Sequence, residues 1–177
     1  MSTSIVRKEG LRSSSTLPSS TRDIDDVQTM VTMTVGQHLF GIPIHDVRDI
    51  FIPENVFAVP LAPPTVVGLI NLRGRIVTVF DVAVRLGIST NRLDQKRKKM
   101  CVTIEQDGEH YGLLVDQIGD IVEVRESMFA GLPSHTNALW HQLATGVYKL
   151  DHNLLVALDV NEVLENEQPY LMLDQAA

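Results

Sequence analysis

The sequence repeats itself, and this repeat restricts the folds available to the chain more than any other feature. Residues 41–50, GIPIHDVRDI, align with residues 112–121, GLLVDQIGDI, at an offset of 71 residues. Residues 68–86 align with residues 146–164 at an offset of 78. The difference of seven residues places an insertion in the second copy, where residues 138–143 are predicted to form a short helix. Two copies of one order of short apolar segments indicate two similar structural units.

Short apolar runs separated by turn residues predict that both units are built from strands. In the first copy, strands are predicted at 30–35 and 39–44, and a further extended segment at 47–52. The turn between the first two strands, residues 36–38, is aligned with residues 108–110 of the second copy. Short strands must hide their edges, and closure into small barrels does this. The fold class is therefore predicted to be all-β, with two small barrels and a few short helices, including one near the C-terminus.

One hairpin, residues 68–81 with the sequence GLINLRGRIVTVFD, joins two apolar strands by a polar turn. Gly74 can adopt the positive φ that a tight turn requires. Arg73 lies in the same turn, where the second copy has Asp151-His152 in place of Arg73-Gly74. Because the strands agree between copies while the turns differ, the basic turn is a candidate contact site. The alternative is that Arg73 pairs with an acidic side chain of its own unit, or with backbone carbonyls between units.

The composition excludes several classes of function. A net charge of −7 argues against generic binding of nucleic acid, which requires a positively charged surface. Cys101, the only cysteine, lies in an apolar strand and is predicted to be an inert core thiol in a reducing compartment. No apolar run approaches the roughly 20 residues of a membrane helix, so direct membrane insertion is not expected. The basic run at residues 96–99 is interpreted as a solvated connector rather than a phosphate-binding patch.

Aspartates recur at matching positions in the two copies, which raises the question of an enzyme. Paired carboxylates can act as acid and base, so the alternative function is a small-ligand-binding or hydrolytic β-barrel protein. A simpler interpretation places these side chains at strand ends or helix N-caps. The six histidines lack the spacing of metal ligands, and no phosphate-binding or nucleophile motif is present, so neither catalytic residues nor cofactors nor metals are predicted. The four aspartates are Asp49, Asp81, Asp120 and Asp159.

The chain is predicted to consist of one folded region between two tails. Residues 1–26 are rich in serine and threonine and are expected to be disordered, and residues 169–177 form a C-terminal tail. Within residues 27–168, the first lobe is predicted at about 27–88 and the second at about 99–168. No run of alternating parallel strands and helices follows the barrels, which disfavours a piece of a larger regulator.

These motifs resemble those of the CheW family, the coupling proteins of bacterial chemotaxis. The resemblance rests on GLINLRGRIVTVFDV at residues 68–82, preceded by GIPIHDVRDI and an apolar loop with prolines, and it extends from about Val27 to Leu164. It implies two intertwined five-stranded barrels of SH3-like type without catalytic activity. It also implies a cytoplasmic scaffold, recruited to membrane-associated arrays, that joins the cytoplasmic tips of chemoreceptors to the regulatory domain of the CheA histidine kinase.

The same resemblance implies which residues face a receptor. It leaves the kinase contact undefined beyond the ends of the two lobes. Gly68 and Gly74 have a structural explanation as well, because close backbone approach and turn geometry require glycine. Val47 is equally well explained as a core residue. The receptor-facing groove and its supporting hairpin map onto Val47, Asp49, Gly68, Asn71, Arg73 and Gly74.

Overall fold

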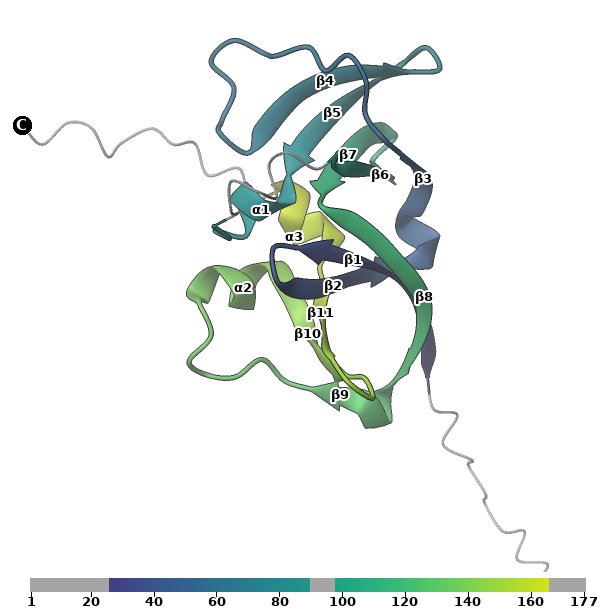
Figure 1. Ribbon diagram of the computed structural model, residues 1–177, viewed down its shortest axis with the longest axis vertical. Helices are drawn as coiled ribbons and strands as arrows, with labels where there is room; N and C mark the ends of the chain where they lie inside the picture. Colours follow the sequence, from purple (N-terminus) through teal and green to yellow (C-terminus); the bar gives the residue numbers. More distant parts are fainter. Residues whose placement is uncertain (1–25, 90–97, 166–177) are drawn as a thin grey trace, which may run out of the picture.

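In the computed structural model, residues 26–89 and 98–165 are described, and they form two β-sheets (Figure 1). The strands are β1 (Val27–Val35), β2 (His38–Pro43), β3 (Val47–Phe51), β4 (Val66–Leu72), β5 (Arg75–Asp81), β6 (Met100–Gln106), β7 (Glu109–Val115), β8 (Gln117–Arg125), β9 (Phe129–Ala130), β10 (Ala144–Lys149) and β11 (Leu154–Leu158). One sheet has five strands in the order β3-β6-β7-β5-β4. The other has six, in the order β8-β1-β2-β11-β10-β9.

Short helices follow the last strand of each copy, and an aspartate begins each of them. The Asp81 carboxylate accepts a hydrogen bond from the N–H of Ala83 at 2.9 Å, and the Asp159 carboxylate accepts one from the N–H of Asn161 at 3.0 Å. These are N-caps, which satisfy backbone donors that the first helical turn leaves unpaired. The predicted helices are confirmed: α1 (Val82–Arg85), α2 (Ala138–Leu143) and α3 (Val160–Glu165), with two unpredicted single turns, η1 (Ile44–Asp46) and η3 (Glu126–Met128).

The two copies exchange their first hairpins. The β1–β2 hairpin of the first copy lies in the six-stranded sheet, where β1 pairs with β8 and β2 runs parallel to β11. The β6–β7 hairpin of the second copy lies in the five-stranded sheet, where β6 pairs with β3 and β7 runs parallel to β5. Each sheet therefore contains strands from both copies, and the predicted intertwined all-β architecture is confirmed. The two-residue strand β9, which was not predicted, gives one sheet its sixth member.

The strand registers reproduce the offsets seen in the sequence. Gly68 of β4 pairs with Val79 of β5, and Gly146 of β10 pairs with Ala157 of β11, which is the same pairing 78 residues further on. In both ladders the register shifts immediately before the glycine. Successive side chains of a strand point to opposite faces of the sheet. Because the registers match, equivalent residues of the two copies lie on equivalent faces of their sheets.

One detail of the predicted alignment is wrong by a single residue. The β1–β2 turn is Gly36-Gln37 and the β6–β7 turn is Asp107-Gly108, so the structural offset stays at 71 through the turn. The alignment of residues 36–38 with 108–110 matched glycine to glycine. Glycine stands first in one turn and second in the other, because a two-residue turn can use positive φ at either place; Gly36 has a φ of 61° and Gly108 a φ of 80°.

The largest core cluster lies between the two sheets and joins them into one body. It contains fully buried side chains from both sheets, among them Phe40 and Ile42 of β2 and Leu113 of β7. Each sheet also has a smaller cluster of its own, such as Cys101 with Val79 in the five-stranded sheet. Close packing across the boundary means that surfaces on the two sheets are held at a fixed separation.

Some sequence-based predictions fall outside the described residues. The predicted tails lie there apart from Asp26, as do residues 96 and 97, the first half of the basic run before β6. Lys99, at the end of that run, is not solvated as predicted: its Nζ donates to the Asp81 carboxylate at 2.8 Å, and 19% of its side chain is exposed. Asp81 therefore both caps α1 and pairs with a lysine that precedes β6.

Candidate protein-interaction site

The tip of the β4–β5 hairpin is a two-residue turn, Arg73-Gly74, in which both residues have positive φ, 52° and 87°. The side-chain oxygen of Asn71 accepts a hydrogen bond from the N–H of Gly74 at 2.8 Å. Turns with positive φ at both central residues match the twist of an antiparallel hairpin. The predicted hairpin and the positive φ at Gly74 are therefore confirmed.

Arg73 is an unusual residue for its place in this turn. The β6–β7 turn has the same backbone conformation, with Asp107 at a φ of 52°, and aspartate, asparagine or glycine is the usual choice there. For other residues the left-handed conformation costs on the order of 1 kcal/mol. The turn itself does not require an arginine, so the strain indicates that the side chain serves a contact. Sequence reasoning missed this strain, because it assigned positive φ to the glycine alone.

The Arg73 side chain reaches across the open side of the five-stranded sheet. Its guanidinium lies 3.3 Å from the Asp49 carboxylate, and Asp49 belongs to β3, the edge strand opposite β4 (Figure 1). The arginine side chain remains 83% exposed, so the ion pair contributes at most about 1 kcal/mol to folding. The interpretation that Arg73 pairs with an acidic side chain of its own unit is therefore confirmed, while its role as a contact for a partner stays a prediction.

The six residues mapped by the resemblance divide into two groups. Asn71, Arg73, Gly74 and Asp49 gather at the hairpin tip through the contacts described above. Gly68 lies away from the tip at the β4 bulge, where it is buried. Val47 is half-buried and packs against the large core cluster, as the structural interpretation of that residue expects.

Gly68 is required by the close approach of the preceding loop. A Cβ added there would lie 2.4 Å from the backbone oxygen of Phe57, and Gly68 has a φ of +155°. The loop is held at this distance by two backbone hydrogen bonds of 2.8 Å between Phe57 and Leu69. The glycine therefore lets the loop cover the edge of β4.

The recurring aspartates do not form an acid–base pair. Asp81 and Asp159 are the helix caps described above, so the N-cap interpretation is confirmed for both. Asp49 pairs with Arg73, and Asp120 is exposed on β8. Among the described residues, no group of three or more histidine, cysteine, aspartate or glutamate side chains is arranged to hold a metal ion.

Cys101 is fully buried on β6, and burial raises the pKa of its thiol from 9.0 to about 12. Because the thiolate is the reactive form, we expect the native protein at pH 8 to resist modification by Ellman's reagent and the urea-unfolded chain to react at once. Unfolding frees the thiol to ionise, so this group adds stability below pH 9 that is lost progressively as the pH rises toward 12. Rapid labelling without denaturant would contradict the buried placement.

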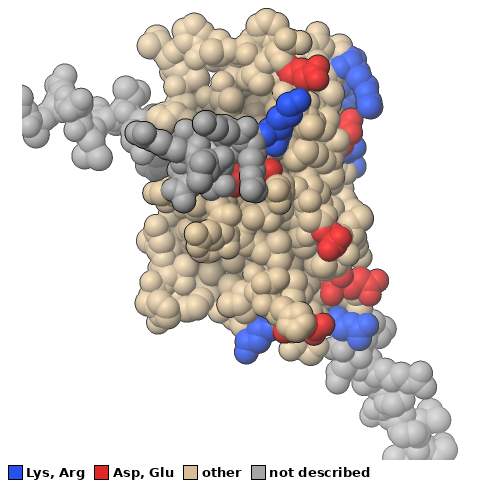
Figure 2. All heavy atoms as spheres, in the orientation of Figure 1, with Lys and Arg blue, Asp and Glu red and all other residues tan. Residues whose placement is uncertain are grey.

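A second exposed feature was not predicted. The segment between β3 and β4, residues 52–65, is here called the apolar loop. It contains five large hydrophobic residues that are at least one-third exposed: Ile52, Val56, Phe57, Val59 and Leu61. Figure 2 shows few charged side chains on the upper left of the molecule, over β4 and this loop. In the sequence this segment is an apolar connection with prolines at residues 60, 63 and 64, and nothing in that pattern predicts its exposure.

Leu61 is the most informative residue of the apolar loop. Its side chain is fully exposed, and its φ is 62°, in the left-handed region. Within the described chain, neither feature contributes to stability, since the side chain buries no apolar area and the backbone is strained. Exposed apolar residues that gather in one segment are typical of a protein-binding surface.

The protein thus presents a charged hairpin tip and an apolar loop on one rigid β-structure. A family model described as a CheW-like domain matches residues 29–168. The chain belongs to the CheW family. As a member of this family it is a coupling adaptor of chemotaxis, and the alternative of a hydrolytic or ligand-binding barrel is not favoured.

Individual relatives agree with the family match. The "Probable chemotaxis protein CheW" of Rhizobium etli is 25% identical over 139 residues, which cover 78% of this chain and 88% of that protein. The CheW of Thermotoga maritima is 26% identical over 136 residues, covering 77% and 87%. The crystal structure of the scaffolding protein TtCheW from Thermoanaerobacter tengcongensis has a TM-score of 0.70 at 24% identity, over 79% of this chain and 94% of that one. This likeness confirms the CheW fold.

The described helices bear on the question of membrane insertion. In residues 26–89 and 98–165, the longest helices have six residues, and none is long and apolar enough to cross a bilayer.

Proposed function

We propose that this protein couples chemoreceptors to the CheA histidine kinase, as a cytoplasmic, non-catalytic adaptor recruited to receptor arrays. The observation that carries the proposal is the presence of two separate exposed surfaces on an interlocked double β-unit of the CheW family. An adaptor needs two surfaces whose relative position is fixed. Strand β4 supplies that rigidity, because it pairs with β5 up to the hairpin tip and is hydrogen-bonded to the apolar loop through Phe57 and Leu69.

The hairpin tip is the proposed receptor surface. Arg73 extends into solvent beside Asp49, so the pair offers both signs of charge to a partner. Complementary charge mainly fixes partner choice and orientation, which suits an adaptor that must hold its partners in register. Val47 supports this surface from within through core packing, and Gly68 lies in β4, the strand that leads to the hairpin tip.

The apolar loop is the proposed kinase surface. The regulatory domain of the kinase is expected to resemble this chain, and the fully buried core of a protein–protein interface is more apolar than the rest of the surface. Phe57 is 65% exposed and Leu61 is fully exposed, so both are available as anchors. Large apolar anchors carry a disproportionate share of binding energy at such interfaces.

A three-component binding assay tests the proposal. The chain is immobilised and offered a chemoreceptor cytoplasmic fragment, the kinase regulatory domain, or both together. Simultaneous capture of both partners is the expected result. Capture of neither, by a folded protein, would overturn the proposed function.

Replacing Leu61 by asparagine is expected to weaken binding of the kinase without changing binding of the receptor. Asparagine adopts positive φ more readily than leucine, so the stability should stay the same or rise by a few tenths of a kcal/mol. Kinase binding should weaken by about 30-fold, the effect of losing an anchor worth ~2 kcal/mol. Receptor binding should stay unchanged. Calorimetric titration measures both affinities, and an unchanged kinase affinity would exclude this loop as the kinase surface.

A further inference from the structure

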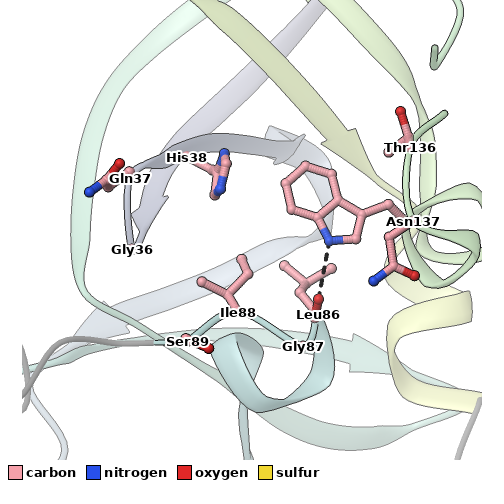
Figure 3. A pocket seen from close by; sticks show the side chains of 10 residues that line it. Gly36, Gln37, His38, Leu86, Gly87, Ile88, Ser89, Thr136 and Asn137 are labelled. Carbon is pink, nitrogen blue, oxygen red and sulfur yellow. Dashed lines mark hydrogen bonds between the residues drawn. The ribbon is translucent and has the colours of Figure 1, made fainter.

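A groove on the six-stranded sheet is used by neither proposed surface. It consists of two adjoining pockets with volumes of about 490 and 670 Å³, and both are lined by Gln37, His38, Thr136 and Trp140. We call it the Trp140 groove. Figure 3 shows the first pocket, with the β1–β2 turn on one side, the residues after α1 below, and Thr136 and Asn137 on the opposite side.

Trp140 is held firmly in the wall of this groove. Its Nε1 donates to the backbone oxygen of Leu86 at 3.1 Å, as the dashed line in Figure 3 marks. Its ring lies edge-on to His38 and Phe40, with centroids 5.0 and 5.4 Å apart. A large aromatic ring that is anchored on one side and open to a pocket on the other is a ready contact for an apolar ligand.

The chemistry of the second pocket indicates what it would bind. Its floor is apolar, and Leu154 projects there with 60% of its surface exposed. Lysine and histidine stand among the lining residues as Lys149, His38 and His152. Within the described lining no aspartate or glutamate is present. An occupant with large apolar side chains and flanking negative charge would complement the groove.

The end of the chain carries that chemistry. Residues 170–173 read Tyr-Leu-Met-Leu, and they stand between Glu167 and Asp174. These residues follow α3 and lie outside the described part of the chain. The apolar run is too short to fold alone, yet it matches the size of a pocket that accepts a few side chains.

The end of α3 is placed close to the groove. Arg85 donates to the backbone oxygens of Val163 at 2.9 Å and Glu162 at 3.3 Å, which ties α1 to the last turn of α3. The next residue, Leu86, accepts the hydrogen bond from Trp140. Only the four residues 166–169 link α3 to the apolar run, and they can span at most about 14 Å, so the run would enter the groove from the side of Leu86.

We propose that residues 170–173 dock in the Trp140 groove, with their acidic neighbours toward its basic lining. The C-terminal segment then acts as an internal cover for an apolar surface of the six-stranded sheet.

Fluorescence tests the proposal directly, because Trp140 is the only tryptophan in the chain. A variant ending at Gln168 should show red-shifted emission and an acrylamide quenching constant at least about twofold higher, since an apolar cover has been removed from the ring. A peptide of residues 166–177 added to this variant should reverse both changes. A peptide with the same residues in scrambled order should not.

Two further variants keep the test decisive. Full-length protein carrying Leu171→Ser and Leu173→Ser should behave like the truncated chain, which covers the case in which truncation impairs folding. Removal of residues 1–25 is the matched control and should leave the emission unchanged. Equal quenching of full-length and truncated protein would overturn the proposal. Quenching that falls with protein concentration would overturn it as well, because a second copy would then be the cover.

Discussion

Gly68→Ala is expected to lower the free energy of unfolding by about 3 kcal/mol, because an added methyl group would press into the backbone oxygen of Phe57 at 2.4 Å and the φ of +155° disfavours alanine. Relief requires the apolar loop to leave β4, which breaks its two hydrogen bonds to Leu69. Urea unfolding followed by circular dichroism measures the loss.

The repeat provides a matched control for this substitution. Gly146 occupies the equivalent position in the second copy, and its added Cβ would lie 2.2 Å from the ring of Phe129. That ring is the far end of a side chain that is 46% exposed, so it can rotate away at a cost of about 1 kcal/mol. Gly146→Ala should therefore destabilise the protein much less. Equal losses at the two glycines would show that backbone approach is not what requires Gly68.

Arg73→Glu is expected to reduce receptor-dependent stimulation of the kinase by at least about tenfold, because it reverses the charge of the proposed receptor surface. The new carboxylate would also repel Asp49, which lies 3.3 Å from the present guanidinium. Kinase autophosphorylation in vesicles that contain receptor, kinase and this protein measures the effect. Retained stimulation would remove Arg73 from the proposed surface.

Arg73→Asn distinguishes the effect of the arginine side chain on binding from the effect of this residue on the stability of the turn. Asparagine adopts positive φ at little cost, so this variant should be as stable as the parent or more stable by about 0.5 kcal/mol. It should still lose receptor affinity, since the guanidinium is absent. A variant that gains stability while losing coupling would show that the arginine is retained for binding.

The local elements could be predicted from sequence because their signals are local. Apolar alternation, turn glycines and helix-capping aspartates act within a few residues, and the strand pairings in both copies follow them. The repeat added the register, since two copies of one pattern must cover the same faces.

The exchange of hairpins could not be derived from these signals. The β1–β2 hairpin has nearly the same pattern as β6–β7, so either could pair with either set of remaining strands. The family resemblance implied the intertwined arrangement, while the residues alone left it open. The choice depends on contacts between residues distant in the chain, such as β2 against β11, which leave no periodic trace.

The sequence and the resemblance named the residues of the candidate site, and their role as a contact stays a proposal. The sequence indicated Arg73 through the difference between the two turns, yet the positive φ of that residue and its distance to Asp49 required coordinates. The apolar loop was missed because exposure, rather than composition, distinguishes an interaction surface from a buried connection.

The hairpin exchange has a consequence for any ancestor or fragment that carries one copy alone. In this chain, the first hairpin of each copy pairs with the remaining strands of the other copy. A copy on its own would therefore have a hairpin and a set of strands without their present partners. Its unsatisfied edges would be complementary to those of an identical molecule, so it should assemble as a two-fold symmetric dimer that trades hairpins between subunits. The present chain has the architecture of such a dimer fused into one polypeptide, which allows its two copies to diverge, as the turns Arg73-Gly74 and Asp151-His152 have done.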